Sequence, residues 1–251
     1  MTRIVVVVSG GIDSVTMAHQ LAAQGHRLHL LAVDYGQRHR KELGFARATA
    51  ERLGAPYEEV DLTAVGRLLR GSSLTDPAVP VPDAQQAPSG PNPNIVPNRN
   101  ALLLAVAYSV AVVERARAVA FGAMADDVGP SDTSPAFLAA FLAMERIATF
   151  GQAVPGLELL APLITLHKPE VILRGVELGV PWQETWTCFR GGELHCGGCA
   201  ACVERRTAFA AAAVKDPTEY RREPAASRGE GRRPQERPEA DAAPPSRETA
   251  L

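Results

Sequence analysis

The sequence contains no apolar run long enough to cross a membrane. Its longest, Ala101–Val113, lies between Arg99 and Glu114 and falls short of the roughly 20 residues that a spanning helix needs. No export signal is visible, because the apolar run Ile4–Val8 is too short for a signal peptide and leads straight into a glycine-rich turn. We therefore expect a soluble, cytoplasmic protein with no membrane partner.

The sequence also lacks an excess of charge of either sign. Its formal net charge is −2 over 251 residues, whereas binding of nucleic acid through a basic surface needs clustered Lys and Arg. Nucleic acid is therefore not an expected partner. Apolar residues make up 46% of the chain and charged residues 22%, which is ordinary for a globular protein. The length is enough for one core with a small appendage.

Cysteine is absent outside one short segment, which holds Cys188, Cys196, Cys199 and Cys202. A disulfide framework would distribute cysteines so that they link distant loops. Four thiolates complete a tetrahedral Zn²⁺ site without an open position, so we expect one structural zinc ion per chain. An iron–sulfur cluster is the alternative, because cysteines separated by two residues also occur there.

A glycine-rich hexapeptide, Ser9-Gly10-Gly11-Ile12-Asp13-Ser14, follows the first apolar run. A strand that leads through such a turn into a helix exposes backbone N–H groups at the helix N-terminus, where they attract phosphate. The glycines allow an anion to approach closely, and the serines add hydroxyl donors. No Gly-Lys-Ser/Thr follows, which excludes the ordinary P-loop with its lysine. A turn that needs glycine for geometry alone is the alternative.

Strands and helices are expected to alternate along the N-terminal half. The predicted strands are Ile4–Val8, Leu28–Val33, Tyr57–Val60 and Ala118–Phe121. The predicted helices are Ser14–Gln24, Arg40–Leu53 and Ala101–Arg115. The last helix is apolar nearly all round, which predicts that it is buried. The alternation indicates an α/β fold with a doubly wound parallel sheet. Its ligand should lie at the carboxyl ends of the strands, beside the hexapeptide.

Two segments rich in proline mark the other divisions of the chain. Gly71–Pro97 contains seven prolines and predicts a long loop, of the kind that often covers an active site. From Arg221 onward the only large aliphatic residue is Leu251, which predicts a disordered tail. We expect a sheet domain over residues 1–180, a zinc-binding and helical C-terminal region over 181–218, and the tail over 219–251.

The hexapeptide resembles the SGGxDS signature of the PP-loop ATP pyrophosphatases. These enzymes cleave ATP between the α- and β-phosphates and adenylate a substrate oxygen. They include amide-forming ligases and tRNA-modifying enzymes. The resemblance implies that the loop and the start of the next helix hold ATP, with Mg²⁺ neutralising the developing charge. The residues that it assigns to ATP are Val8, Ser9, Gly10, Gly11, Ile12, Asp13, Ser14, Val15, Thr16, Met17 and Ala18.

Further segments resemble one subfamily, the 7-cyano-7-deazaguanine synthases, in the same order along the chain. Asp34–His39 resembles that family's DYGQRH, and Val96–Asn100 resembles its VPGRN. Ser73–Asp76, Leu178–Pro181 and Thr185–Cys188, with Pro162, Leu163, Lys168 and Glu170, extend the match to the cysteines. The resemblance implies a homodimeric ligase of queuosine biosynthesis. Such an enzyme converts 7-carboxy-7-deazaguanine and ammonia to the nitrile, through an adenylated acid and an amide.

Five side chains outside the hexapeptide are candidates for the site. Asp34 and Arg38, at the end of the second strand, are expected to bind the nucleotide; a loop ion pair is the alternative. Arg99, Asp132 and Lys168 are expected to contact the substrate or to handle protons. Arg99 begins a helix, where a positive charge is mildly unfavourable, and this misfit favours a functional role.

The sequence departs from the family at two places. Asn98 stands where VPGRN has glycine. The family's segment SGYPDCRPEF reads Val128–Phe137 here, which keeps Asp132, Pro135 and Phe137 but lacks the tyrosine, arginine and glutamate that could recognise a deazapurine. The alternatives are a paralogue that forms an amide or nitrile on a different carboxylate, a PP-loop tRNA-modifying enzyme, and a non-catalytic nucleotide-sensing or zinc-dependent interaction protein.

Overall fold

The computed structural model describes residues 2–86, 91–126 and 132–221. Two segments considered above lie outside these ranges: Val128–Ser131, and the part of the expected tail beyond Arg221.

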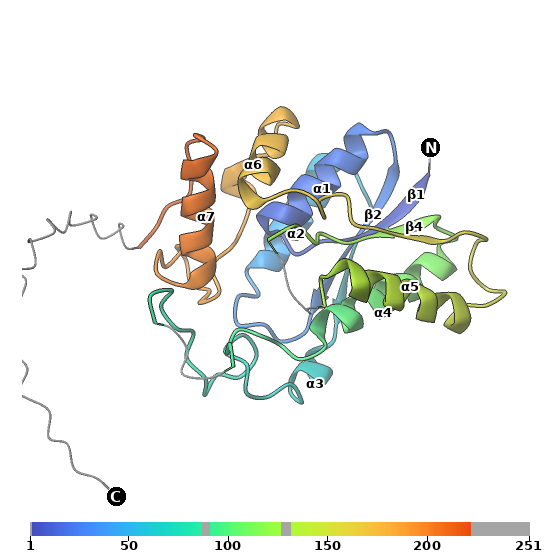
Figure 1. Ribbon diagram of the computed structural model, residues 1–251, viewed down its shortest axis with the longest axis horizontal. Coiled ribbons are helices and arrows are strands. Elements are labelled where there is room, and N and C mark those ends of the chain that lie inside the picture. The colour runs from blue at the N-terminus through green and yellow to red at the C-terminus, as the bar shows by residue number, and fades with distance from the viewer. Residues whose placement is uncertain (1, 87–90, 127–131, 222–251) are drawn as a thin grey trace, which may run out of the picture.

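Five parallel strands form a sheet in the order β3-β2-β1-β4-β5 (Figure 1). The strands are β1 (Arg3–Val7), β2 (Arg27–Asp34), β3 (Tyr57–Asp61), β4 (Ala118–Ala120) and β5 (Glu158–Leu160). The chain first adds strands on one side of β1 and then returns to its other side with β4. The direction of winding therefore reverses between β1 and β4, which is where ligands of open α/β sheets bind.

Helices cover both faces of the sheet. They are α1 (Ile12–Ala23), α2 (Glu42–Leu53), α3 (Thr63–Gly66), α4 (Arg99–Val113), α5 (Pro135–Ala148), α6 (Lys168–Glu177) and α7 (Ala200–Ala211), with a 3₁₀ turn η1 at Trp182–Glu184. One face packs against α1, α2, α6 and α7, and the other against α4 and α5 (Figure 1). The doubly wound α/β fold expected from the sequence is confirmed.

The side chains of β1 divide between the two cores. Ile4 and Val6 join the core beneath α1 and α6, whereas Val5 and Val7 join the core beneath α4. Successive side chains of a strand point to opposite faces, so a strand covered on both sides must be apolar throughout. The unbroken apolar run that predicted this strand is therefore explained by its central position.

The prediction that the apolar helix Ala101–Arg115 is buried holds for one of its faces only. Helix α4 buries one face, on which Leu104, Ala107 and Ala111 lie, and leaves Val113 81% exposed. The helix belongs to the outer layer, so only the face toward β1 and α5 has neighbours. Apolar composition gave the helix correctly but overstated its burial.

The proline-rich loop packs against the cysteine segment. Asp83 pairs with Cys199 in an isolated bridge, and Ala84 N–H donates to the carbonyl of Gly198 at 2.9 Å. Arg190 also reaches the loop, with its guanidinium 3.0 Å from an Asp83 carboxylate oxygen. The loop is thus tied to the C-terminal region that follows it by about 100 residues.

Helices in the described ranges are all too short or too polar to span a membrane.

Candidate active site

The hexapeptide joins β1 to α1 and opens toward the carboxyl edge of the sheet. Gly10 has φ +81°, and a Cβ there would lie 2.4 Å from the carbonyl oxygen of Glu42, so this position requires glycine. Helix α1 has Gly11 as its N-cap and no side chain caps its first N–H groups. Such N–H groups, at the positive end of the helix dipole, are donors for an anion.

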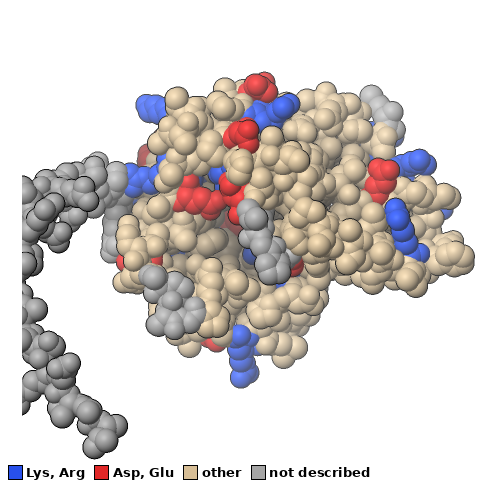
Figure 2. All heavy atoms as spheres, in the orientation of Figure 1, with Lys and Arg blue, Asp and Glu red and all other residues tan. Residues whose placement is uncertain are grey.

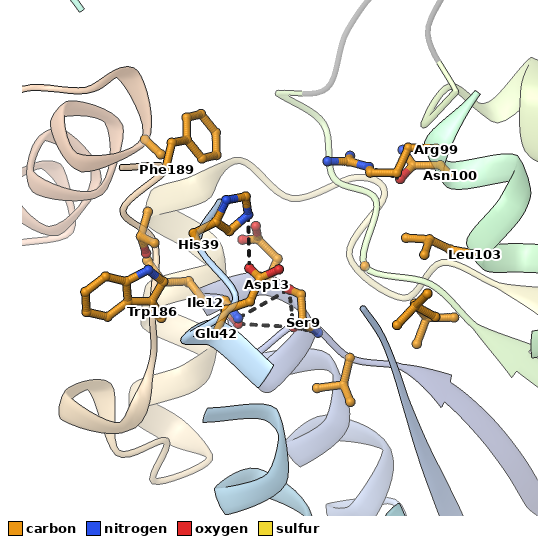
Figure 3. Close-up of a pocket in the computed structure, with 18 of the residues that line it drawn as sticks. Ser9, Ile12, Asp13, His39, Glu42, Arg99, Asn100, Leu103, Trp186 and Phe189 are labelled. Atoms are coloured by element: carbon orange, nitrogen blue, oxygen red, sulfur yellow. Dashed lines mark hydrogen bonds and ion pairs between the residues drawn. The ribbon is translucent and has the colours of Figure 1, made fainter. Parts of the chain in front are cut away.

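Two serine hydroxyls give the loop its shape. The Ser14 hydroxyl oxygen accepts from the N–H of Ser9 at 3.1 Å and lies 3.2 Å from the Ser9 hydroxyl oxygen. The Ser9 hydroxyl in turn accepts from the N–H of Gly11 at 3.3 Å (Figure 3). These bonds hold the loop closed around its own hydroxyl groups, which are the donors that an incoming phosphate would engage.

The loop has no lysine of its own, but α6 supplies one. Lys168, the first residue of α6, has its ammonium 2.7 Å from a carboxylate oxygen of Asp13 and 3.5 Å from one of Glu204 on α7. The other carboxylate oxygen of Asp13 is buried and has no hydrogen-bond partner among the described residues. An unsatisfied buried oxygen is costly, so the arrangement fits a bound ligand or cation that completes it.

A cavity of about 330 Å³ opens beside the loop, within the range of small-molecule sites. Figure 2 shows a hollow near the middle of the face, with acidic side chains gathered beside it. The walls of the cavity come from four places in the chain: the loop with α1, the end of β2 with α2, the start of α4, and the cysteine segment with α7. The predicted site residues that line it are Val8, Ser9, Gly11, Ile12, Asp13, Ser14, Arg99 and Lys168.

Arg99 reaches into the cavity from the start of α4, opposite the loop (Figure 3). Its Nε donates to the side-chain oxygen of Asn100 at 3.0 Å, and its guanidinium hydrogen-bonds the Tyr35 hydroxyl. Burial raises the pKa of Tyr35 to about 12, so the phenol stays neutral. No carboxylate lies within ion-pair distance of Arg99 in the described part of the chain. A half-buried guanidinium with no carboxylate beside it among the described residues suits recognition of a carboxylate or phosphate.

The asparagine that departs from the family pattern keeps the backbone shape. Asn98 has φ 58° and ψ 18°, the left-handed region in which glycine is most at ease and asparagine is the usual substitute. This turn is what directs Arg99 toward the cavity. The departure from VPGRN is therefore conservative in its backbone geometry.

Asp132 does not reach the cavity wall. One of its carboxylate oxygens accepts from the backbone N–H of Asn100 at 3.1 Å, and the other accepts from the Asn100 side-chain amide at 3.0 Å. Asp132 thereby holds the first turn of α4 in place beside Arg99. Its position supports a role in positioning the arginine rather than in contacting a ligand.

Asp34 and Arg38 also have other partners. The Arg38 guanidinium donates to the carbonyl oxygens of Ser73, Asp76 and Val79 at 3.0 Å each, which anchors the proline-rich loop. Asp34 forms an ion pair with Arg40. Neither side chain lines the cavity. The expected nucleotide contacts of these two residues gain no support from the geometry.

Other residues of this region line the cavity instead. Tyr35 and His39 of the same motif do so, as does Glu42, which follows the motif, and sequence reasoning did not single them out. Of the remaining residues assigned to ATP, Gly10 is buried in the loop, and Val15, Thr16, Met17 and Ala18 are buried in α1 beneath it. Alternation at the strand end could have indicated Tyr35, because its side chain points opposite to that of Asp34.

The four cysteines converge in a buried cluster, with all four sulfur atoms within 4.8 Å of one another. Backbone N–H groups point at the sulfurs: the N–H of Cys196 lies 3.3 Å from the Cys188 sulfur, and that of Cys199 lies 3.2 Å from the Cys196 sulfur. Four thiolates this close would need a cation between them, so the cluster could hold a metal ion. Nearby His195 accepts from the N–H of Thr187 through Nε2, which leaves the cysteines as the ligand set.

The cysteine region also forms a wall of the cavity. Trp186, Thr187 and Phe189, on either side of Cys188, all line it. Arg205 of α7 lies behind them with no exposed surface and donates to Thr185, Thr187 and Asp216. The cysteine cluster and the cavity are therefore parts of one packed structure.

The matching family model and the relatives found by sequence agree on one family. A family model described as "Queuosine biosynthesis protein QueC" matches residues 3–213. A 7-cyano-7-deazaguanine synthase from Rhizobium rhizogenes is 46% identical over 220 residues, which cover 87% of this chain and 92% of the relative. The synthase from Rhizobium meliloti has the same identity and coverage. Among solved structures, NMN synthetase from Francisella tularensis has a TM-score of 0.48 and 16% identity, covering 85% of this chain and 78% of its own.

Proposed function

The chain belongs to the QueC family of queuosine biosynthesis proteins, and from that membership we propose that it converts 7-carboxy-7-deazaguanine and ammonia into 7-cyano-7-deazaguanine at the expense of ATP. The protein is an ATP-dependent enzyme of this family. The observation that carries the specific reaction is the arrangement of one cavity between an anion-binding loop and a half-buried arginine. The loop suits a pyrophosphate, and the arginine suits a carboxylate.

The first step is activation of the acid. Arg99 holds the substrate carboxylate, one of whose oxygens attacks the α-phosphorus of ATP as the bond to the β-phosphate breaks. Pyrophosphate leaves into the loop, where N–H groups of α1 and the hydroxyls of Ser9 and Ser14 stabilise its charge by donating hydrogen bonds. Lys168 adds the positive charge that this loop lacks.

The later steps convert the activated acid to a nitrile. Ammonia attacks the adenylated carboxyl carbon and AMP leaves, which gives an amide. A second ATP then activates the amide oxygen, and loss of AMP and of the nitrogen-bound protons leaves the carbon–nitrogen triple bond. Adenylation is needed twice because neither a carboxylate oxygen nor an amide oxygen is a good leaving group.

Two metal ions complete the proposal. The cluster fits a single Zn²⁺, because ligands at about 2.3 Å in a tetrahedron lie about 3.8 Å apart, and the sulfurs of Cys196 and Cys202 are 3.9 Å apart. The space between the four sulfurs is small for an iron–sulfur cluster. Mg²⁺ would be held by the phosphates of ATP and Asp13, whose buried free oxygen has the right chemistry. Bound there, it would neutralise charge on the leaving pyrophosphate.

Mass spectrometry tests the reaction directly. The purified protein is incubated with ATP, Mg²⁺, ammonium and 7-carboxy-7-deazaguanine, and the expected result is loss of the acid with appearance of the nitrile. Unchanged 7-carboxy-7-deazaguanine would contradict the proposal and favour a paralogue acting on another carboxylate. The altered segment ahead of α5 motivates that second candidate. There Thr133 lines the cavity and Ser134 caps α5, accepting from the N–H of Phe137 at 3.2 Å.

A further inference from the structure

A histidine and a glutamate face one another in the cavity wall, and the steps above do not use them. His39 precedes α2 and Glu42 is its first residue, and both line the cavity while being only 5% and 8% exposed. Nε2 of His39 lies 3.4 Å from a carboxylate oxygen of Glu42. Figure 3 shows the pair beside the loop, across the cavity from Arg99.

Hydrogen bonds fix the glutamate in an accepting orientation. The side-chain amide nitrogen of Gln37 donates to Glu42 at 3.0 Å and to the carbonyl of Val33 at 3.2 Å. The amide oxygen of Gln37 accepts from the N–H of Tyr35 at 2.9 Å. Because the amide oxygen of Gln37 is bound to Tyr35, its amide nitrogen must point toward Glu42. The second carboxylate oxygen of Glu42 is therefore left to face His39.

The surroundings favour a proton held between the two side chains. Burial raises the pKa of the Glu42 carboxyl group, so that a free negative charge there is unfavourable. The ring of Phe189 lies 5.7 Å from the His39 ring and limits its rotation. An imidazole and a buried carboxylate in this arrangement can take up a proton at the cavity wall and stabilise it as a pair.

The other ionisable groups of the cavity have partners that commit them elsewhere. Lys168 is a cation between Asp13 and Glu204. Arg205 is paired with Asp216, and Asp132, which lies outside the cavity wall, binds Asn100 through both carboxylate oxygens. The phenol of Tyr35 stays neutral beside Arg99. Among the groups of the cavity wall between the loop and Arg99, the pair of His39 and Glu42 is therefore the best placed to accept a proton.

We propose that His39, supported by Glu42, accepts the proton that nitrogen loses when ammonia attacks the adenylated acid. The nitrogen lone pair forms the bond to the carboxyl carbon, and the nitrogen becomes positively charged. Nε2 of His39 takes one proton from it, the carbon–oxygen bond to AMP breaks, and AMP leaves with that electron pair. The products are the amide, AMP and a protonated His39–Glu42 pair, which returns its proton to water. This step rests on the proposed function.

The test separates activation of the acid from use of ammonia. Without ammonium, the wild-type protein should release a burst of about one pyrophosphate per site on mixing with ATP, Mg²⁺ and 7-carboxy-7-deazaguanine. His39→Gln keeps a polar side chain near Glu42 but cannot hold the proton. We expect this variant to release the burst within about twofold of the wild-type rate, and to form amide and nitrile about 10²- to 10⁴-fold more slowly once ammonium is added.

A matched histidine provides the control. His29 on β2 is also buried and lies 3.7 Å from a glutamate, Glu58, but it is outside the cavity wall. His29→Gln should leave both the burst and the ammonia-dependent step within about twofold of wild type. Glu42→Gln should behave like His39→Gln, with a normal pyrophosphate burst and a slow ammonia-dependent step. If circular dichroism shows that His39→Gln does not fold, Glu42→Gln serves as the test in its place.

Two results would overturn the assignment. One is a folded variant that loses the burst and the ammonia-dependent step together, which would make the pair part of the ATP site. The other is a variant that forms amide within about fivefold of the wild-type rate. A wild-type protein that gives no burst with this acid would overturn the proposed function itself, and the proton transfer with it.

Discussion

The ammonium of Lys168 lies 2.7 Å from the carboxylate of Asp13, although 155 residues separate them in the chain. A lysine inside the loop is the usual device of P-loop proteins. Here the corresponding charge comes from the first turn of α6, packed beside α1. The loop and α6 therefore have to be assembled before the anion site is complete.

This ion pair leads to a prediction for ATP cleavage. Asp13→Ala should abolish acid-dependent pyrophosphate release, and Lys168→Gln should slow it by about 10²- to 10³-fold, the range found for loss of one preorganised charge or donor. A coupled pyrophosphate assay measures both rates. Lys215→Gln, which changes an exposed lysine after α7, should have no effect. Normal release by the Lys168 variant would remove this lysine from the site.

The start of α6 predicts a dependence on pH. Nδ1 of His167 lies 2.6 Å from one carboxylate oxygen of Asp126, whose other oxygen accepts from the N–H of Lys168 at 2.7 Å. The hydrogen bond to Asp126 raises the pKa of His167 above its ordinary 6.5. The stability from this pair is therefore fully present below about pH 6.5 and is lost as pH rises through the raised pKa.

NMR titration of the His167 ring checks this directly. Asp126→Asn should return the pKa of His167 toward its ordinary value, and the difference in unfolding free energy between wild type and variant should shrink as pH rises above about 6.5 and through the raised pKa. His26→Gln serves as the control, because no ion pair of His26 occurs in the described ranges. A His167 titration that is unchanged in Asp126→Asn would contradict the prediction.

The left-handed residue before Arg99 predicts a contrast between two substitutions. Asn98→Gly should leave the unfolding free energy within about 1 kcal/mol of wild type, whereas Asn98→Val should lower it by about 1–2 kcal/mol, because a branched side chain is strained at φ 58°. Denaturant titration gives both values. Equal stability of the two variants would mean that this turn adopts another backbone conformation in solution.

The cysteine cluster predicts the metal content. Elemental analysis of the purified protein should give about one zinc per chain, and Cys202→Ser should reduce both the zinc content and the melting temperature. No cysteine lies outside the cluster, so thiol titration of the unfolded chain before and after chelation counts the ligands. Iron with inorganic sulfide in place of zinc would contradict the zinc assignment.

The sequence indicated the elements better than their burial. Apolar runs identified β1, β2 and β4 to within about two residues, because strands covered on both faces have to be apolar. The edge strand β3 was also predicted, although its side chains are half-buried or exposed. The short edge strand β5 and helices α5 and α6 were given no bounds, and α7 was expected only as part of a helical C-terminal region. For helix α4 the sequence predicted too much burial, because composition cannot tell which side of an apolar helix packs against a neighbour.

The same limit applies to the site. Motifs located the hexapeptide and the cysteines, since each is continuous or nearly so in the chain. The DYGQRH-like motif was also found, but the sequence did not indicate which of its members line the cavity: Arg38 anchors the proline-rich loop, whereas His39 faces the cavity. Which of these side chains faces the cavity depends on how the turn between β2 and α2 packs against residues 73–79. A match between short motifs carries no information about that packing.

The shared wall between the cysteine cluster and the cavity has a practical consequence. Trp186, Thr187 and Phe189 flank Cys188, so we expect their positions to depend on the four sulfurs staying together, whereas the sheet has its own separate core. A chain without its ion should stay largely folded and fail to turn over. The specific activity of different preparations should then vary in proportion to their metal occupancy. A preparation with low activity would be incompletely loaded with metal rather than misfolded.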